Sequence, residues 1–109
     1  MIQIEIIRSR NRISAFRAHG HSGTAPKGQD IVCAGVSALA QTALLGLSEH
    51  LHRSISYDVH PGGDLQMKLQ GEPDELTEAI LETMLLGLTE IQRQYPEDVQ
   101  ITETRDSRG

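Results

Sequence analysis

One apolar stretch constrains the fold of this chain more than any other feature. Residues 31–48 carry no charged side chain and are rich in alanine, leucine and valine. The stretch is close to the minimum length of a membrane span, but glycine, serine, threonine and glutamine interrupt it. We interpret it as a helix of a soluble domain that continues to about residue 52. Because it is apolar nearly all round, we expect it to be central and covered on most sides.

The length of the chain leaves room for one domain around this helix. With 109 residues, the chain can bury one modest core. We assign residues 1–104 to a single domain and residues 105–109 to a polar C-terminal tail, which is expected to fray. The apolar fraction of 38% and the charged fraction of 23% are typical of a soluble globular protein. Aromatic residues make up only 3%, so aliphatic side chains must fill the core.

Charge and cysteine content limit the cellular location and the binding partners that are expected for this chain. The formal net charge is −5 and the isoelectric point is about 5.4, which argues against nucleic acid as a partner. The N-terminus alternates apolar and polar side chains instead of presenting the apolar block of a secretory signal. We therefore expect a cytoplasmic protein that binds no membrane. The single cysteine permits no intrachain disulfide and no cysteine-rich metal site.

Alternating hydrophobicity predicts five strands. Isoleucines at every second position from Ile2 to Ile6 alternate with polar residues, which is the period of a half-buried strand. A turn at residues 9–11 leads into a second arm over residues 12–18. Residues 55–59 and 65–69 alternate in the same way around a Pro-Gly-Gly-Asp turn and predict a second hairpin. A last short strand is expected near Val99 and Ile101.

A second helix follows the second hairpin. Pro73 and Asp74 mark its start, and Pro96 marks its end. The apolar residues predicted to form its buried stripe are Leu76, Ile80, Met84, Leu88, Ile91 and Tyr95. The element order is therefore β-β-α-β-β-α-β. It predicts an α+β fold in which two helices pack on a largely antiparallel sheet.

The only cysteine lies where a thiolate would be stabilised. Asp30 is a good N-cap for the first helix, which places Cys33 in its first turn, near the positive end of the helix dipole. Thiolates are favoured there, and the thiolate is the nucleophilic form of cysteine. The unpaired backbone N–H groups of that first turn would also suit an oxyanion. A lone cysteine in an apolar helix is more often an inert core residue.

A glycine-rich loop upstream of the helix carries a possible partner for this thiol. His21 lies in the segment 20–28, and an imidazole near a thiol acts as a general base. Gly20, Gly23 and Gly28 make the segment a candidate lid over the helix start. If His21 is not the base, His19 is the first alternative.

Two further polar residues have both a functional and a structural interpretation. Asp30 either only caps the helix or also orients His21. Ser37 follows Cys33 by one helical turn and shares its face. It either hydrogen-bonds near the thiolate or, as is more usual, bonds a carbonyl of its own helix. Pairs of histidines at 19/21 and 50/52 lack a carboxylate pattern, so we expect no metal and no cofactor.

The segment around the histidine and the cysteine resembles a known family signature. The stretches Gly20-His21-Ser22-Gly23 and Gly28–Leu39, which contains Asp-Ile-Val-Cys-Ala, are similar to the motif of the ribosomal-processing cysteine proteases. The chain also resembles that family in length and in element order. Two mild departures are Ser22 and Gly35, where the family more often has alanine.

The resemblance implies a fold, an activity and a set of site residues. Members of the family are homodimeric α+β endopeptidases that remove an N-terminal extension from a large-subunit ribosomal protein during ribosome biogenesis. Carried over to this chain, Cys33 is the nucleophile, His21 is the general base, and Asp30 and Ser37 have supporting roles. The expected partners are therefore a ribosomal protein precursor and a second copy of the chain.

Two other functions remain compatible with the sequence. One is a dimeric binding module that holds a ribosomal protein and in which Cys33 is buried and inert. The other is a redox-sensing thiol protein. A reactive Cys33 would distinguish an enzyme from the binding module. Turnover of a substrate would distinguish an enzyme from the redox sensor.

Overall fold

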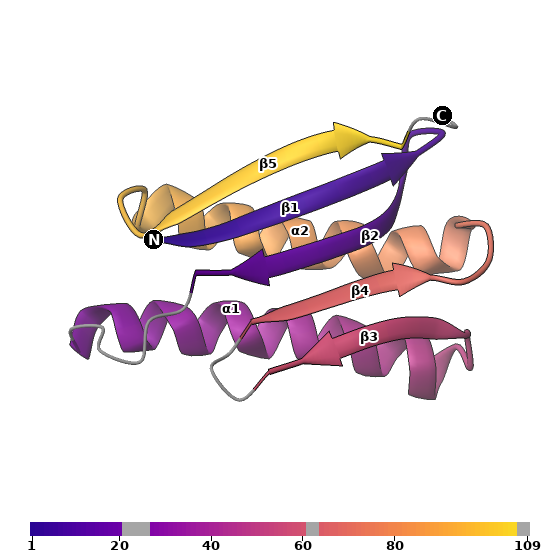
Figure 1. Cartoon of the computed structure of the whole chain (residues 1–109), viewed down its shortest axis with the longest axis horizontal. Coiled ribbons are helices and arrows are strands. Elements are labelled where there is room, and N and C mark those ends of the chain that lie inside the picture. Colours follow the sequence, from indigo (N-terminus) through magenta and orange to yellow (C-terminus); the bar gives the residue numbers. More distant parts are fainter. Residues whose placement is uncertain (21–26, 61–63, 107–109) are drawn as a thin grey trace.

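The chain folds into one five-stranded sheet with two helices on the same face (Figure 1). The structure, a computed structural model, describes residues 1–20, 27–60 and 64–106, without the side chains of residues 27–30. The elements are β1 (Ile2–Ser9), β2 (Arg12–His19), α1 (Lys27–Leu45), the π-helical turn η1 (Gly46–His50), β3 (Ile55–Val59), β4 (Leu65–Leu69), α2 (Glu75–Gln94) and β5 (Val99–Arg105). This confirms the predicted α+β class and element order.

The strands lie in the order β3-β4-β2-β1-β5. Neighbouring strands pair antiparallel except β5, which lies parallel to β1. The β1–β2 connection is a tight turn in which Arg10 and Asn11 have φ angles of 53° and 72°, as expected of a two-residue hairpin turn. β5 continues to Arg105, so the ordered fold includes the first residue of the predicted tail.

The core lies between the sheet and the helices. One side of β1, β2, β4 and β5 faces it, because side chains alternate along a strand, whereas β3 contributes only the partly buried Ile55. β1 contributes Ile2, Ile4 and Ile6, which are all nearly inaccessible. From the other strands and the helices come Ile13, Phe16, Ala18, Leu65, Met67, Leu69, Val99, Val32, Val36, Ala40, Ala43, Leu44, Leu47, Leu81, Met84 and Leu88. The core is aliphatic except for one phenylalanine, as the composition requires.

Glycines allow the two helices to approach each other closely. A Cβ atom placed on Gly87 of α2 would lie 2.9 Å from Cδ1 of Leu39 on α1. In the same way, a Cβ on Gly35 of α1 would lie 3.3 Å from Cδ1 of Ile91 on α2. Each helix therefore accepts a branched side chain of the other at a position without a side chain of its own. Gly35, where the resembled family more often has alanine, is one of these contact points.

The start of α1 differs from the prediction. The helix begins at Lys27, so Asp30 is not its N-cap but the fourth helical residue. Gly28 lies in the first turn and not in the predicted loop, and Cys33 lies in the second turn. The sequence contains a second start signal that explains the difference: Pro26 precedes Lys27, and proline favours helix starts. An aspartate is also favourable inside a first turn, through the helix dipole.

Burial of α1 is also less complete than predicted. The stretch Ile31–His50 is long and apolar enough to span a membrane, and only 33% of its most apolar part is buried in the fold. Core helices of soluble domains can be equally long and apolar, so the stretch alone is weak support for a membrane span. Ile31 and Leu45 are 70% and 59% exposed. One side of α1 therefore packs on the sheet and on α2, and an apolar side remains accessible.

The predicted stripe of α2 is shifted at both ends. Leu76 and Tyr95 are exposed, while Thr77 and Leu81 are buried. The start of the helix explains the phase. Asp74 accepts hydrogen bonds from the backbone N–H groups of Leu76 and Thr77, and the Thr77 hydroxyl accepts one from the Asp74 N–H at 2.9 Å. This reciprocal cap turns Thr77 toward the sheet, so the core-facing side begins there.

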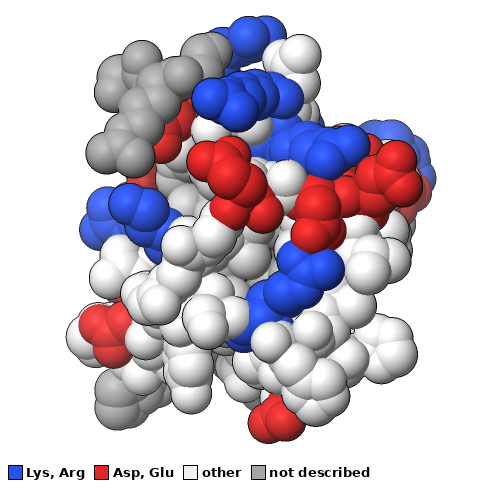
Figure 2. Space-filling view, turned by 90° about the vertical axis from the view of Figure 1, so that its right-hand side faces the viewer, with Lys and Arg blue, Asp and Glu red and all other residues white. Residues whose placement is uncertain are grey.

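Charged side chains of both signs gather at the end of the molecule that carries the β1–β2 turn (Figure 2). Arg8 is central among them. Its Nη1 lies 2.6 Å from Glu82 of α2, and its Nε lies 2.6 Å from Glu103 of β5. The two carboxylates raise the pKa of the Arg8 guanidinium above its ordinary value, the Glu82 hydrogen bond most strongly. Arg8 therefore ties β1, the edge strand β5 and the helix layer together.

The cap of α2 makes stability depend on pH in a defined direction. The hydrogen bond from Arg53 and the backbone donors lower the pKa of Asp74. A lowered pKa contributes stability above the ordinary aspartate range, and that contribution is lost as pH falls through the folded-state pKa. We expect Asp74→Asn to lower the thermal midpoint at pH 7 and to converge with wild type near pH 2. Glu97→Gln, beyond the end of α2, is the control. A constant gap across the range would contradict the prediction.

Candidate active site

Cys33 lies in the second turn of α1, on the side of the helix that faces the core. Its side chain is half-buried and packs against the hydrophobic core, while part of it remains accessible. Helical side chains lean toward the helix N-terminus, so the Cys33 side chain leans toward the first turn of α1. That end of α1 lies on the same side of the molecule as the end of β2 (Figure 1).

The earlier helix start changes the electrostatics predicted for Cys33. The backbone N–H groups without an intrahelical partner belong to the first turn, which spans residues 27–30 and precedes Cys33. The influence of the helix dipole falls off within that turn. The dipole therefore stabilises a Cys33 thiolate less than predicted from an Asp30 cap. More of the activation must come from a neighbouring basic group.

The structure brings only some of the predicted site residues together. Ser37 lies one turn beyond Cys33 on the same side of α1. Its side chain is half-buried. The backbone of Asp30 lies one turn before Cys33, but its side chain is outside the described part. His21 and Gly23 also lie outside the residues that the structure describes. Their predicted roles therefore stay predictions.

His19 lies on the wrong side of the sheet to assist Cys33. It pairs with Gln3 across the β1–β2 ladder, and its Nε2 lies 3.9 Å from Oε2 of Glu5. Gln3 and Glu5 alternate with the buried isoleucines of β1, so they and His19 face the side without helices. Cys33 belongs to the helix layer on the other side. His19 is therefore a poor substitute for His21 as the base.

Gly20 directs the chain from β2 toward the predicted histidine. Its φ angle is +95°, a backbone conformation that residues with a side chain rarely adopt. A Cβ atom there would lie 2.4 Å from the carbonyl oxygen of Met1. The Gly20 N–H donates a hydrogen bond of 3.1 Å to Oδ1 of Asp64, at the start of β4. The sequence suggested a flexible lid residue, but the structure shows a glycine needed at a fixed turn.

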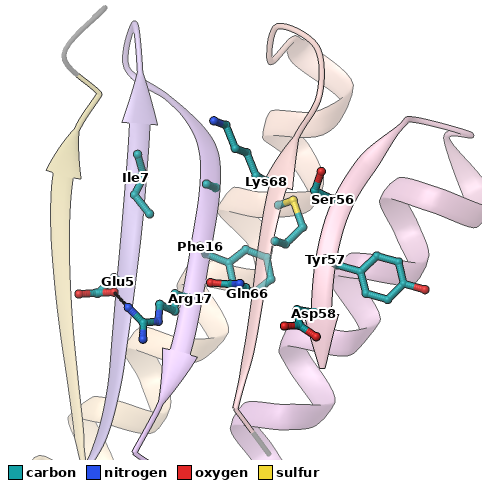
Figure 3. Close-up of a pocket in the computed structure, with 11 residues that line it drawn as sticks. Glu5, Ile7, Phe16, Arg17, Ser56, Tyr57, Asp58, Gln66 and Lys68 are labelled. Carbon is teal, nitrogen blue, oxygen red and sulfur yellow. Dashed lines mark ion pairs between the residues drawn. The ribbon is translucent and has the colours of Figure 1, made fainter. Parts of the chain in front are cut away.

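The open face of the sheet carries a shallow hollow of about 510 Å³ (Figure 3). Its lining includes Ile7, Glu5, Arg17, Ser56, Asp58 and Lys68. The hollow exists because no helix covers this face, and Cys33 is not part of it. Within the described residues, no three His, Cys, Asp or Glu side chains gather as metal ligands would.

Comparison with known proteins identifies the family. The model of the cysteine protease Prp family matches residues 1–100. The chain belongs to this family. It is 30% identical to the ribosomal processing cysteine protease Prp of Staphylococcus aureus, over 93% of this chain and 97% of the relative. Identity to Prp of Bacillus subtilis is also 30%, over 94% and 96% of the two chains.

Solved structures show the same fold. A crystal structure of the essential ribosomal processing protease Prp from S. aureus, in complex with a substrate peptide, superposes with a TM-score of 0.87. The superposition covers 95% of this chain and 100% of the other, at 23% identity. The two-helix, five-strand architecture is therefore that of Prp. As a member of the Prp family, the chain is an enzyme, a cysteine protease.

The conformation of Gly20 generates a testable expectation. Gly20→Ala places a methyl group against the Met1 carbonyl and forces a residue with a side chain into positive φ. We expect a loss of folding free energy on the order of 1–3 kcal/mol, measured by urea unfolding. Gly71→Ala is the matched control, because a Cβ at Gly71 would meet nothing within 4 Å. Equal stability of the two variants would contradict the role assigned to Gly20.

Proposed function

We propose that this protease removes the N-terminal extension of a large-subunit ribosomal protein, with Cys33 as nucleophile and His21 as general base. The main support for Cys33 as nucleophile is that a cysteine protease requires a thiol and that the chain contains one cysteine. Cys33 is partly accessible and lies on a regular helix. Both properties suit a nucleophile that has to be held in a defined position.

The chemistry follows from a thiol and an imidazole. His21 takes the proton of Cys33, and the thiolate attacks the carbonyl carbon of the scissile peptide bond. The C–N bond breaks as the imidazolium gives its proton to the leaving nitrogen, and a thioester with Cys33 remains. A water molecule, deprotonated by His21, then attacks the thioester. The C–S bond breaks, the N-terminal fragment leaves as a carboxylic acid, and the thiol is restored.

Neighbouring groups have supporting roles in this proposal. The N–H groups of the first turn of α1 would donate hydrogen bonds to the oxyanion, because the Cys33 side chain leans toward that turn. Asp30, one turn before Cys33, would orient His21. Ser37, one turn after Cys33, would hydrogen-bond near the thiolate. Gly20 would provide the turn that leads into the segment with His21, and Gly23 would allow that segment to close over a bound substrate.

The substrate is proposed from the relatives and from charge. The Prp proteins of S. aureus and B. subtilis are named ribosomal processing proteases, and the former has been crystallised with a substrate peptide. The net charge of −5 would attract a basic protein such as a ribosomal protein. We place the reaction in the cytoplasm. Membership of a protease family disfavours a pure binding module, and a redox sensor would lack a resolving cysteine.

Substitution of the two catalytic residues tests the proposal. Cys33→Ala should abolish cleavage of the precursor and should still bind it, and Cys33→Ser should be nearly inactive because a hydroxyl is a weaker nucleophile. His21→Ala should lose roughly 10²–10⁴-fold in kcat, the size of general acid–base assistance. The measurement is precursor processing followed by mass spectrometry.

The control is His52→Ala, which changes an exposed histidine beyond the far end of α1. It should process the precursor at the wild-type rate. Cleavage by Cys33→Ala at a comparable rate would overturn the assignment of the nucleophile. Full activity of His21→Ala would overturn the assignment of the base. Wild-type protein that binds the precursor but never cleaves it would support the binding-module alternative.

We also propose a homodimer that covers the apolar outer side of α1. Ile31, Ala34, Ala38 and Leu45 are all exposed, at intervals of three, four and seven residues along the helix, with the exposed polar residue Gln41 between the last two. This spacing places them on one side. An exposed apolar strip of this kind marks an interface. A second copy is the simplest partner because a twofold axis pairs the strip with itself.

The oligomeric state is open to direct measurement. Sedimentation at micromolar concentration should give the mass of a dimer, and Leu45→Glu should shift it toward the monomer because a buried charge is costly. Gln100→Glu introduces the same carboxylate on the uncovered side of the sheet, opposite Gln3 in the β1–β5 ladder, and should leave the dimer intact. A monomer mass for the wild-type protein would overturn this proposal.

A further inference from the structure

The segment between β2 and α1 starts from a point that two distant parts of the chain hold in place. β2 ends at His19, and its last ladder partners are Gln3 on β1 and, for Ala18, Leu65 on β4. Gly20 lies just beyond both ladders. The Met1 carbonyl is close on one side of it, and the Asp64 carboxylate accepts its N–H at 3.1 Å.

Asp64 is itself fixed by the hairpin to which it belongs. Its carbonyl oxygen accepts a hydrogen bond from the His60 N–H at 2.8 Å, which closes the β3–β4 connection. The next residue, Leu65, is buried in the core and pairs with Val59 and Ala18. The side chain of Asp64 thus extends from a rigid strand end to Gly20. It joins two connections that are 44 residues apart in sequence.

We propose that Asp64 is a positioning residue of this protease that sets where the segment carrying His21 leaves the sheet. The inference rests on the proposed role of His21. Consecutive Cα atoms are about 3.8 Å apart, so the orientation of Gly20 limits where the next residue starts. The other end of the segment is held by the first turn of α1, which also leads to Cys33. Asp64 would therefore act on His21 through the backbone, by holding the residue that precedes it.

The bond requires an acceptor oxygen and not a negative charge. Asp64→Asn keeps a carbonyl oxygen at the position of Oδ1, whereas Asp64→Ala removes the acceptor. A misplacement of about 1 Å in a catalytic group costs on the order of 10²-fold in rate. Asp64→Ala should therefore lower kcat roughly 10–100-fold with KM within about threefold. Asp64→Asn should restore most of the rate.

The experiment compares these variants with His21→Ala on a synthetic peptide that spans the junction between the extension and the mature ribosomal protein. Alkylation of Cys33 by iodoacetamide between pH 5 and 9 is the second readout, because it reports how well a base assists the thiol. Asp64→Ala should shift this profile toward that of His21→Ala, and Asp64→Asn should retain the wild-type profile. Asp58→Ala is the matched control, since Asp58 pairs with His60 and not with Gly20.

The outcomes separate this inference from the proposed function. If His21→Ala is inactive and Asp64→Ala has wild-type kcat and alkylation, only the positioning role of Asp64 is overturned. If His21→Ala is fully active, the assignment of the base and the role of Asp64 both fail. Equal losses in Asp64→Ala and Asp64→Asn would also overturn the inference. Thermal unfolding verifies that each variant is folded. If Asp64→Ala does not fold, Asp64→Ser replaces it, because the shorter serine side chain cannot reach Gly20.

Discussion

Burial of one side of α1 against the sheet is the contact on which the rest of the structure depends. Val32 and Val36 of α1, and Leu47 of the turn η1 that continues it, are at most 2% exposed, and each contributes roughly 1.5–3 kcal/mol by leaving water. The same packing fixes the rotation of the helix about its axis. Cys33 follows Val32 directly, so its half-buried position at the margin of the core is set by that rotation. Stability of the fold and placement of the thiol therefore arise from the same side chains.

The candidate site combines a thiol on a packed helix with a proposed base that follows the end of β2. The thiol belongs to a helix that is held by both the sheet and α2, with glycines at the closest contacts. The proposed base follows a strand end whose direction depends on Gly20. Each half is supported by residues distant in sequence, namely Ile91 and Leu39 for the helix pair and Met1 and Asp64 for the strand end.

Sequence reasoning was most successful where the physical signal is local. The isoleucines of β1 alternate with period two, and this alone predicts a half-buried strand. The start of α1 was missed because Pro26 and Asp30 both favour helix starts, and the local sequence does not decide between them. The phase of α2 was missed because the cap at Asp74 buries Thr77, a polar residue. The function of Gly20 was not predictable, since its constraint comes from Met1 and Asp64 across the sheet.

The parallel pairing of β5 with β1 has a consequence for how the molecule is made. The first strand in sequence pairs with the last one, so the outer edge of residues 2–8 has no partner strand until residues 99–105 are made. Closing such a long loop is slow relative to forming the local hairpins. During synthesis, the edge of β1 stays unpaired until β5 has emerged from the ribosome, and unpaired edges invite association with other chains. Arg8, a charged residue near the end of that edge, reduces this hazard until Glu103 arrives to pair with it.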